Sequence, residues 1–305
     1  MVSLRAIFQG RLYRSGGTGG LRRVLCPEKK LLLTYDGTGK QFYLGHWEGD
    51  WYYLGGYDTS QETVDPALTQ GMVEWINTRQ RAVDDARRDT PHSDVYVWNY
   101  LELNRPADTM KKGADRVVNR VLPFTNVDYV SYSAYDSKNA SAREIKKTIR
   151  YIYENLPEKD GVPGPRVFIG EVAEPAESFG FSDSRHCDAN LRILSKYLQC
   201  DVRFCLYWEM YCNEKLDDGR PRGFWLIDQD GNKTKLYREL RDVFAAGKEY
   251  VEAFAATNGR VPTNEEYRRF LLSRPVFVKA RIAVFFEDIW KRIRSAAETF
   301  AATFR

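Results

Sequence analysis

The chain repeats one pattern along most of its length: a short run of β-branched or aromatic residues, a polar loop, and a segment with helical spacing. Five such runs occur, at residues 42–47, 95–101, 127–132, 167–170 and 202–208. Strands that alternate with helices form parallel sheets with crossover helices, and strands buried on both faces read as nearly continuous apolar runs. The pattern therefore predicts an α/β fold with five parallel strands.

The segments between the runs carry helix start signals. Asp65-Pro66 combines a capping side chain with proline in the first helical turn, and Ser141 with Glu144 forms a capping box. Apolar residues then recur every three or four positions, which predicts helices with one buried face. Two further segments show the same spacing, at residues 187–198 and 236–254.

The charge distribution separates the body of the chain from its ends. The net charge of +4 comes from seven basic and one acidic residue in 1–30, and seven basic and three acidic residues in 274–305. Residues 31–273 therefore carry a balance of −6. No segment has the composition of a sequence-specific nucleic-acid reader, so we expect no nucleic-acid partner.

Cysteine and histidine spacing argues against metal and disulfide chemistry. The five cysteines form no CxxC pair and are odd in number, and the three histidines lie far apart in the sequence. Zinc sites and disulfide scaffolds need paired or clustered ligands. We therefore expect no metal and no cofactor.

The two ends bear on localisation and partners. Residues 1–17 contain no uninterrupted apolar segment, so no signal peptide is predicted and a cytoplasmic protein is expected unless the true N-terminus is missing. Residues 274–305 predict a basic amphipathic helix that packs on the fold, with docking on an anionic membrane surface or a partner as alternatives. No feature indicates an oligomeric state.

Polar and aromatic residues gather where the predicted strands end. Polar groups at one end of parallel strands are typical of the active face of a (β/α)8 barrel. Strand alternation places Glu48 on the face of Phe42 and Leu44, and Glu171 on the face of Val167 and Ile169. If these faces point into a barrel, both glutamates converge at its mouth with Trp208. The strand-end residues are His46, Trp47, Glu48, Asp50, Glu102, Tyr132, Tyr135, Glu171 and Trp208.

Two carboxylates with aromatic residues between them suit glycoside hydrolysis. One acid protonates the leaving oxygen while the other attacks the anomeric carbon, and a flat aromatic ring supports the C–H face of a sugar. The alternative interpretation is that each glutamate caps the next helix or pairs with a lysine.

These residues resemble the retaining clan A glycoside hydrolases, which share a (β/α)8 barrel. The resemblance implies that the five strands correspond to strands four to eight of that barrel. It further implies that Glu48 is the acid/base and Glu171 the nucleophile. It assigns Tyr132 or Tyr135 as the tyrosine that supports the nucleophile, and Trp208 as the aromatic residue of the last strand.

The sequence departs from the clan at two points. Trp47 stands where the clan usually has asparagine before its acid/base glutamate, which leaves Glu102 and Asp50 as alternative acids. Strands one to three have no counterpart upstream, so we expect a partial barrel of the TIM type with a C-terminal helical extension. The expected parts are a basic, partly helical lead (1–35), a barrel portion (36–256) and a basic helical tail (257–305).

The expected function is hydrolysis of O-glycosidic bonds in a poly- or oligosaccharide, with retention of configuration. The alternative is a carbohydrate-binding or scaffold remnant of such a barrel without turnover. Beside the two catalytic glutamates, the residues expected to contact the carbohydrate are His46, Trp47, Asp50, Glu102, Tyr132, Tyr135 and Trp208.

Overall fold

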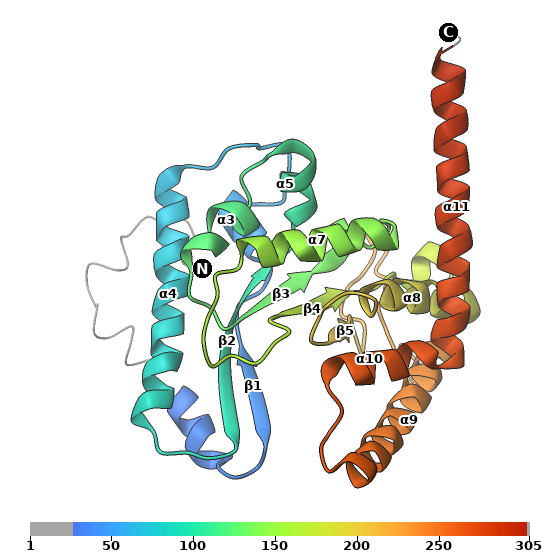
Figure 1. Cartoon of the computed structure of the whole chain (residues 1–305). Helices are drawn as coiled ribbons and strands as arrows, with labels where there is room; N and C mark the ends of the chain where they lie inside the picture. The colour runs from blue at the N-terminus through green and yellow to red at the C-terminus, as the bar shows by residue number, and fades with distance from the viewer. Residues whose placement is uncertain (1–26, 304–305) are drawn as a thin grey trace. The chain divides into compact units, whose positions relative to one another are not determined.

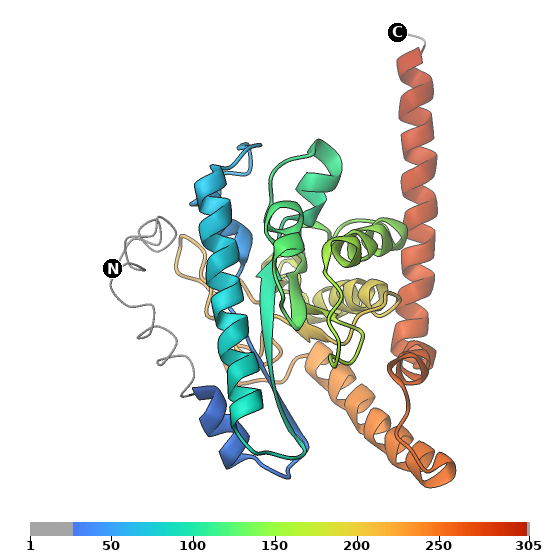
Figure 2. The same ribbon diagram turned by 60° about the vertical axis from the view of Figure 1, so that its left-hand side comes forward.

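A computed structural model describes residues 27–303 of the chain (Figures 1 and 2). It confirms the α/β class, with five parallel strands in the order β1-β2-β3-β4-β5 and helices between them. Most of the expected basic lead lies outside the described residues, and residues 27–34 form a helix. The strands are β1 (Lys40–Leu44), β2 (Val95–Leu103), β3 (Tyr129–Ser133), β4 (Val167–Val172) and β5 (Cys205–Tyr207).

Helices follow each strand. The α-helices are α3 (Gly49–Leu54), α4 (Pro66–Asp89), α5 (Pro106–Lys112), α6 (Val117–Arg120), α7 (Ala142–Asn155), α8 (Asp183–Tyr197), α9 (Lys235–Asn258), α10 (Asn264–Ser273) and α11 (Pro275–Thr303). Short 3-10 helices are η1 (Leu122–Phe124), η2 (Ala134–Asp136) and η3 (Ala176–Phe179).

The chain divides into two compact units. Among residues 27–303, unit 1 consists of the residues up to Asp136 together with Thr148–Gly170, and unit 2 consists of Ser137–Lys147 together with the residues from Glu171 onward. The boundaries fall within β4 and α7, so both elements contribute to both units.

In unit 1 the aliphatic face of β1 and β2 packs against helices. The predicted cap forms at α4, where the Asp65 carboxylate accepts a hydrogen bond from the Ala67 N–H at 2.8 Å. Figures 1 and 2 both show α4 running along this part of the sheet, with the helix at 27–34 near its C-terminal end. The buried cluster contains Leu32, Val83, Ala86, Val95 and Val97, with Phe42 and Leu44 packed against it.

The opposite face of these strands carries aromatic rings. The Tyr43 ring lies 5.2 Å from Tyr129 and 5.8 Å from Phe168, and the Trp98 ring lies 5.6 Å from Tyr129. Because side chains alternate along a strand, Val167 and Ile169 lie opposite Phe168. The expectation that the faces of Phe42 and Leu44, and of Val167 and Ile169, point into a barrel is therefore wrong.

Unit 2 is mainly helical. Thr234 caps α9 by accepting from the Tyr237 N–H at 3.2 Å, and Ser141 and Glu144 form the predicted capping box before α7. β5 is shorter than the predicted run of 202–208, and Leu206 within it is 49% exposed. A strand at the end of the strand order has a partner on one side only, which explains its short length.

The expected C-terminal tail forms two helices, α10 and α11. A capping box of Thr263 and Glu266 begins α10, and α11 packs against α8 through Phe277, Ala280 and Val284. Within residues 27–303, no helix has both the length and the apolar character that a membrane span requires.

Candidate active site

Glu48 lies in unit 1, at a sharp turn between β1 and α3. Its backbone has φ 29° and ψ 72°, in the left-handed region that side chains larger than glycine seldom adopt. Oε1 of Glu48 accepts a hydrogen bond from Ser133 Oγ at 2.6 Å, and Oε2 accepts one from Trp51 Nε1 at 2.5 Å. Because β1 ends at Leu44, this turn and not strand alternation directs the carboxylate toward Ser133.

Glu102, in β2, lies directly beside Glu48. Its Oε1 accepts a hydrogen bond from the Glu48 N–H at 2.8 Å, and its Oε2 accepts one from Ser131 Oγ at 2.5 Å. The side chain is only 4% exposed, and burial raises the pKa of its carboxyl, with a further increase from the neighbouring Glu48 carboxylate. Glu102 therefore holds the backbone of Glu48 in place.

Glycines permit the close approach of these elements. A Cβ at Gly170 would lie 1.9 Å from Ser131 Oγ and 2.8 Å from Glu102 Oε2. A Cβ at Gly49 would lie 2.6 Å from the backbone oxygen of Glu102. Larger residues at either position would force β2, β3 or α3 to move apart.

Asp50 supports the backbone around the glutamates. It is fully buried, with Oδ2 accepting from the N–H groups of Asn104 at 2.8 Å and Arg105 at 3.0 Å, and Oδ1 from that of Val117 at 2.8 Å. Burial raises the pKa of the Asp50 carboxyl, while these hydrogen bonds lower it. The side chain thus joins α3, α6 and the loop after β2.

His46 follows the end of β1, and its ring faces α4. Its ring centre is 5.2 Å from that of Trp75 in α4, and its Nε2 accepts a hydrogen bond from the Glu102 N–H at 3.4 Å. Burial lowers the pKa of the imidazole to about 4. The ring is therefore neutral at pH 7 and acts as an acceptor toward β2.

Aromatic side chains lie on the segment that carries Glu48, and one of them, Trp51, donates to its carboxylate. The Trp47 ring lies 6.2 Å from Tyr52, and the Trp51 ring lies 5.2 Å from Tyr57. Trp47 is 44% exposed and Tyr57 is 72% exposed. Exposed aromatic faces beside a carboxylate provide apolar surface and hydrogen-bonding groups together, as the C–H and O–H groups of a sugar require.

The two tyrosines expected near the nucleophile occupy different environments in unit 1. Tyr132 is fully buried, and its hydroxyl donates a hydrogen bond to Asp136 Oδ1. Burial raises the pKa of Asp136 to about 6, and its Oδ2 accepts from the Ala107 N–H at 2.9 Å. Tyr135 lies in η2 and is half-buried.

Glu171 and Trp208 belong to unit 2, at the ends of neighbouring strands. Glu171 is half-buried and precedes Val172, whose carbonyl accepts a hydrogen bond from the Trp208 N–H at 3.3 Å. The indole of Trp208 donates to Glu214 Oε1 at 3.3 Å. Glu214 in turn binds Arg222 at 3.0 Å, so an ion pair restrains this aromatic side chain.

Three residues of the site were not expected from the sequence: Ser131, Ser133 and Trp51. Ser131 and Ser133 lie two positions apart in β3, a strand that is buried throughout. Two serines with the period of a strand, inside a buried run, are the signal that could have identified them as carboxylate partners.

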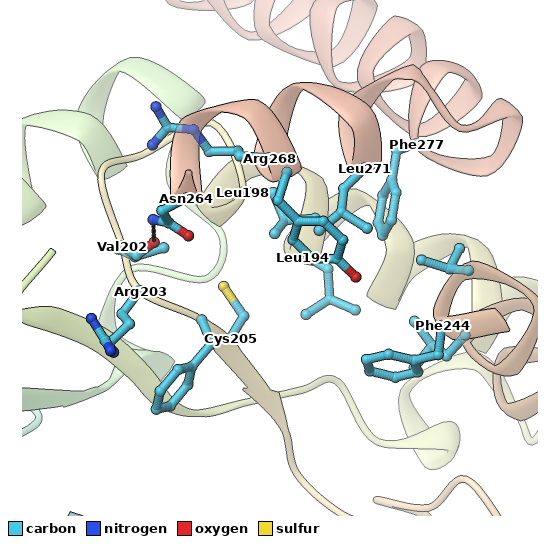
Figure 3. A pocket seen from close by; sticks show the side chains of 14 residues that line it. Leu194, Leu198, Val202, Arg203, Cys205, Phe244, Asn264, Arg268, Leu271 and Phe277 are labelled. Carbon is cyan, nitrogen blue, oxygen red and sulfur yellow. Dashed lines mark hydrogen bonds between the residues drawn. The ribbon is translucent and has the colours of Figure 1, made fainter. Parts of the chain in front are cut away.

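A separate apolar cavity lies within unit 2 (Figure 3). It has a volume of about 170 Å³ and is lined by residues that include Leu194, Val202 and Phe277. Figure 3 shows Asn264 at its edge, donating to the Val202 carbonyl at 3.0 Å. Among the described residues that line it, none is a carboxylate.

Over residues 27–303, no group of three or more histidine, cysteine or acidic side chains is arranged to hold a metal ion. Comparison of the chain with models of protein families, with curated proteins and with solved structures found no match.

Proposed function

We propose that the protein is a retaining glycoside hydrolase that cleaves O-glycosidic bonds in a poly- or oligosaccharide. The main support is the environment of Glu48, a buried carboxylate in the turn after β1 that two side-chain donors hold, on a segment that also carries the exposed aromatic residues Trp47 and Tyr57. This combination offers a proton-transfer group next to surfaces on which a sugar ring can stack.

Among the candidate acids of unit 1, Glu48 fits the acid/base role best. The oxygens of Asp50 accept hydrogen bonds from three backbone N–H groups, and Glu102 fixes the backbone of Glu48. Both of these carboxylates therefore hold main-chain segments in place. The carboxylate oxygens of Glu48, in contrast, accept hydrogen bonds from the side chains of Ser133 and Trp51, and side chains can rearrange when substrate binds.

In the proposed reaction, the Glu48 carboxyl gives its proton to the glycosidic oxygen as the bond from that oxygen to the anomeric carbon breaks. We keep Glu171 as the nucleophile from its position near the end of β4, although alternation puts its side chain on the face of Ile169; in the proposed reaction it forms an ester bond to the anomeric carbon. Glu48 then removes a proton from water, the water oxygen attacks the anomeric carbon, and the Glu171 carboxylate leaves. We assign Trp208 to sugar stacking and Tyr135 to support of Glu171, because the Tyr132 hydroxyl donates to Asp136.

Trapping of the ester intermediate tests the nucleophile. Activated 2-deoxy-2-fluoroglycosides form long-lived esters with such enzymes, so we expect a mass increase of one sugar, located on Glu171 by peptide mapping. Glu171→Gln should abolish labelling and lower kcat on nitrophenyl glycosides by at least about a thousandfold. Glu174→Gln is the matched control, since Glu174 lies three residues further on and pairs with Lys138 at 3.0 Å. Labelling of Glu171→Gln at the rate of the parent would refute the assignment.

The acid/base role has its own signature. Glu48→Gln should lower the rate of hydrolysis far more for substrates with poor leaving groups than for nitrophenyl glycosides, because a good leaving group departs without a proton. If the rate of hydrolysis falls by the same factor for both substrate types, Glu48 is not the acid/base residue.

A second candidate function is carbohydrate binding without turnover. It is favoured by the hydrogen bonds to Glu48, whose two oxygens both have close donors at 2.5–2.6 Å. It predicts that the protein binds sugars on a glycan array, that Trp47→Ala weakens this binding, and that no bound glycan is hydrolysed. Turnover that is lost in Glu171→Gln would exclude it.

A further inference from the structure

We propose that α11 binds the surface of a membrane that contains anionic phospholipid, with its exposed apolar face directed toward the acyl chains. The inference is independent of the proposed glycosidase activity.

Helix α11 has two apolar faces. Phe277, Ala280 and Val284 are buried, at 2%, 5% and 4% exposure, on the side that packs in unit 2. A second face remains open and carries large side chains with exposures between 37% and 63%: Ile282, Phe285, Phe286, Ile289, Trp290 and Ile293. Figure 1 shows the C-terminal part of α11 extending well past α8. One face is thus sufficient to anchor the helix, and the other requires a separate explanation.

The width of the open face indicates the kind of surface it fits. At 3.6 residues per turn, the six side chains span an arc of about 140°. A two-stranded coiled coil needs only a narrow seam of two positions in seven, whereas a helix lying in a membrane interface exposes a broad apolar face. Phe285, Phe286 and Trp290 add the aromatic side chains that are typical of the interface.

Basic residues flank this face. Arg281 and Arg292 lie on one edge and Arg294 on the other, and no ion pair involves them within the part of the chain that the structure describes. Of the acidic residues in this stretch, Glu287 pairs with Arg192 at 3.1 Å, and Asp288 lies on the same edge as Arg281 and Arg292. Guanidinium groups at the edges of an apolar face can bind lipid phosphates while the face itself enters the acyl region. This charge pattern favours an anionic lipid surface.

Vesicle flotation of the full chain tests the proposal. We expect binding to phosphatidylcholine vesicles with one third phosphatidylserine, weaker binding to pure phosphatidylcholine, and loss of binding at high salt. Phe286→Ala with Trp290→Ala should lower partitioning by about tenfold or more, and Arg281→Glu with Arg292→Glu should do the same. Matched controls are Phe244→Ala and Lys248→Glu on α9, whose side chains are 70% and 78% exposed.

Brominated lipid supplies a direct readout. Quenching of tryptophan fluorescence should occur in the parent and be largely absent in Trp290→Phe, a variant that still floats. Three results would overturn the proposal: no flotation of the parent, flotation unchanged in both double variants, or quenching unchanged in Trp290→Phe. Sedimentation equilibrium gives the alternative outcome. If it reveals a dimer that Phe286→Ala with Trp290→Ala dissociates, the open face binds a second copy of the chain and not a membrane.

Discussion

The backbone N–H of Glu48 donates a hydrogen bond to Oε1 of Glu102 at 2.8 Å, across 54 positions of sequence. One strand-end glutamate thereby fixes the backbone from which the other projects. The positive φ of Glu48 is tolerated because this hydrogen bond, together with those from Ser133 and Trp51, holds the turn. The local geometry of the proposed acid/base residue therefore depends on Glu102.

Loss of the Glu102 side chain should destabilise unit 1. In Glu102→Ala, the buried Glu48 N–H and Ser131 hydroxyl lose their acceptor, so we expect the free energy of unfolding to fall by about 2–4 kcal/mol. Glu102→Gln, which keeps the shape and one acceptor oxygen, should cost less than half as much. Urea unfolding followed by circular dichroism measures both, with exposed Glu62→Ala as the control. Equal midpoints for Glu102→Ala and Glu62→Ala would contradict the buried role of Glu102.

Gly170 should tolerate no side chain. The Cβ of Gly170→Ala would lie 1.9 Å from Ser131 Oγ, so Ser131 must move and weaken its hydrogen bond to Glu102. We expect a loss of about 1–3 kcal/mol in the free energy of unfolding. Gly56→Ala is the control, because a Cβ there meets no atom within 4 Å. A Gly170→Ala protein as stable as Gly56→Ala would show that Ser131 can move away from position 170 without loss of stability.

Asp136 should make the stability of unit 1 fall as the pH rises from about 4 to about 6. Burial raises the pKa of its carboxyl from 3.8 to about 6. In that interval the unfolded chain loses the proton first, so rising pH favours unfolding. This difference in pKa between the folded and unfolded chain corresponds to a loss of at most about 3 kcal/mol in the free energy of unfolding. The unfolding free energy of the parent minus that of Asp136→Asn, measured from pH 4 to 7, should therefore fall as the pH rises to about 6. A difference that does not change with pH would be inconsistent with a buried, protonated carboxyl.

His46 should remain neutral well below the usual range for histidine. Burial lowers the pKa of its ring from 6.5 to about 4, so protonation favours the unfolded chain and stability from this group rises with pH between those values. The effect opposes that of Asp136. NMR titration of the ring, assigned with His46→Gln, should give a midpoint near 4 in the folded protein and near 6.5 in urea. A folded midpoint near 6.5 would mean that water reaches the ring freely.

Local patterns in the sequence predicted the elements well. The alternation of apolar runs and helical spacing identified all five strands, and the caps at Asp65 and Ser141 formed as expected. Both features depend on interactions within a few residues of one another, which a linear sequence displays. The bounds of the fifth strand were less predictable, since residues 202–204 and 208 of the predicted run lie outside β5. Strand length there depends on pairing, which is a tertiary property.

The direction of the site side chains could not be predicted in the same way. Alternation from Phe42 correctly marks one face of β1 but does not continue past Leu44, where the strand ends. The positive φ at Glu48 then turns its carboxylate toward Ser133, 85 positions away in the sequence. Tyr132, grouped with Tyr135 by sequence position, is buried and donates to Asp136.

The sequence by itself determined the α/β class, the five parallel strands and the concentration of polar residues after each strand, because hydrophobic periodicity and capping are local properties of the chain. Tertiary structure alone decided which polar residues bind one another. Glu48, Glu102, Ser131 and Ser133 meet because parallel neighbours bring their carboxyl ends to one edge of the sheet, and burial there forces every carboxylate oxygen to find a donor.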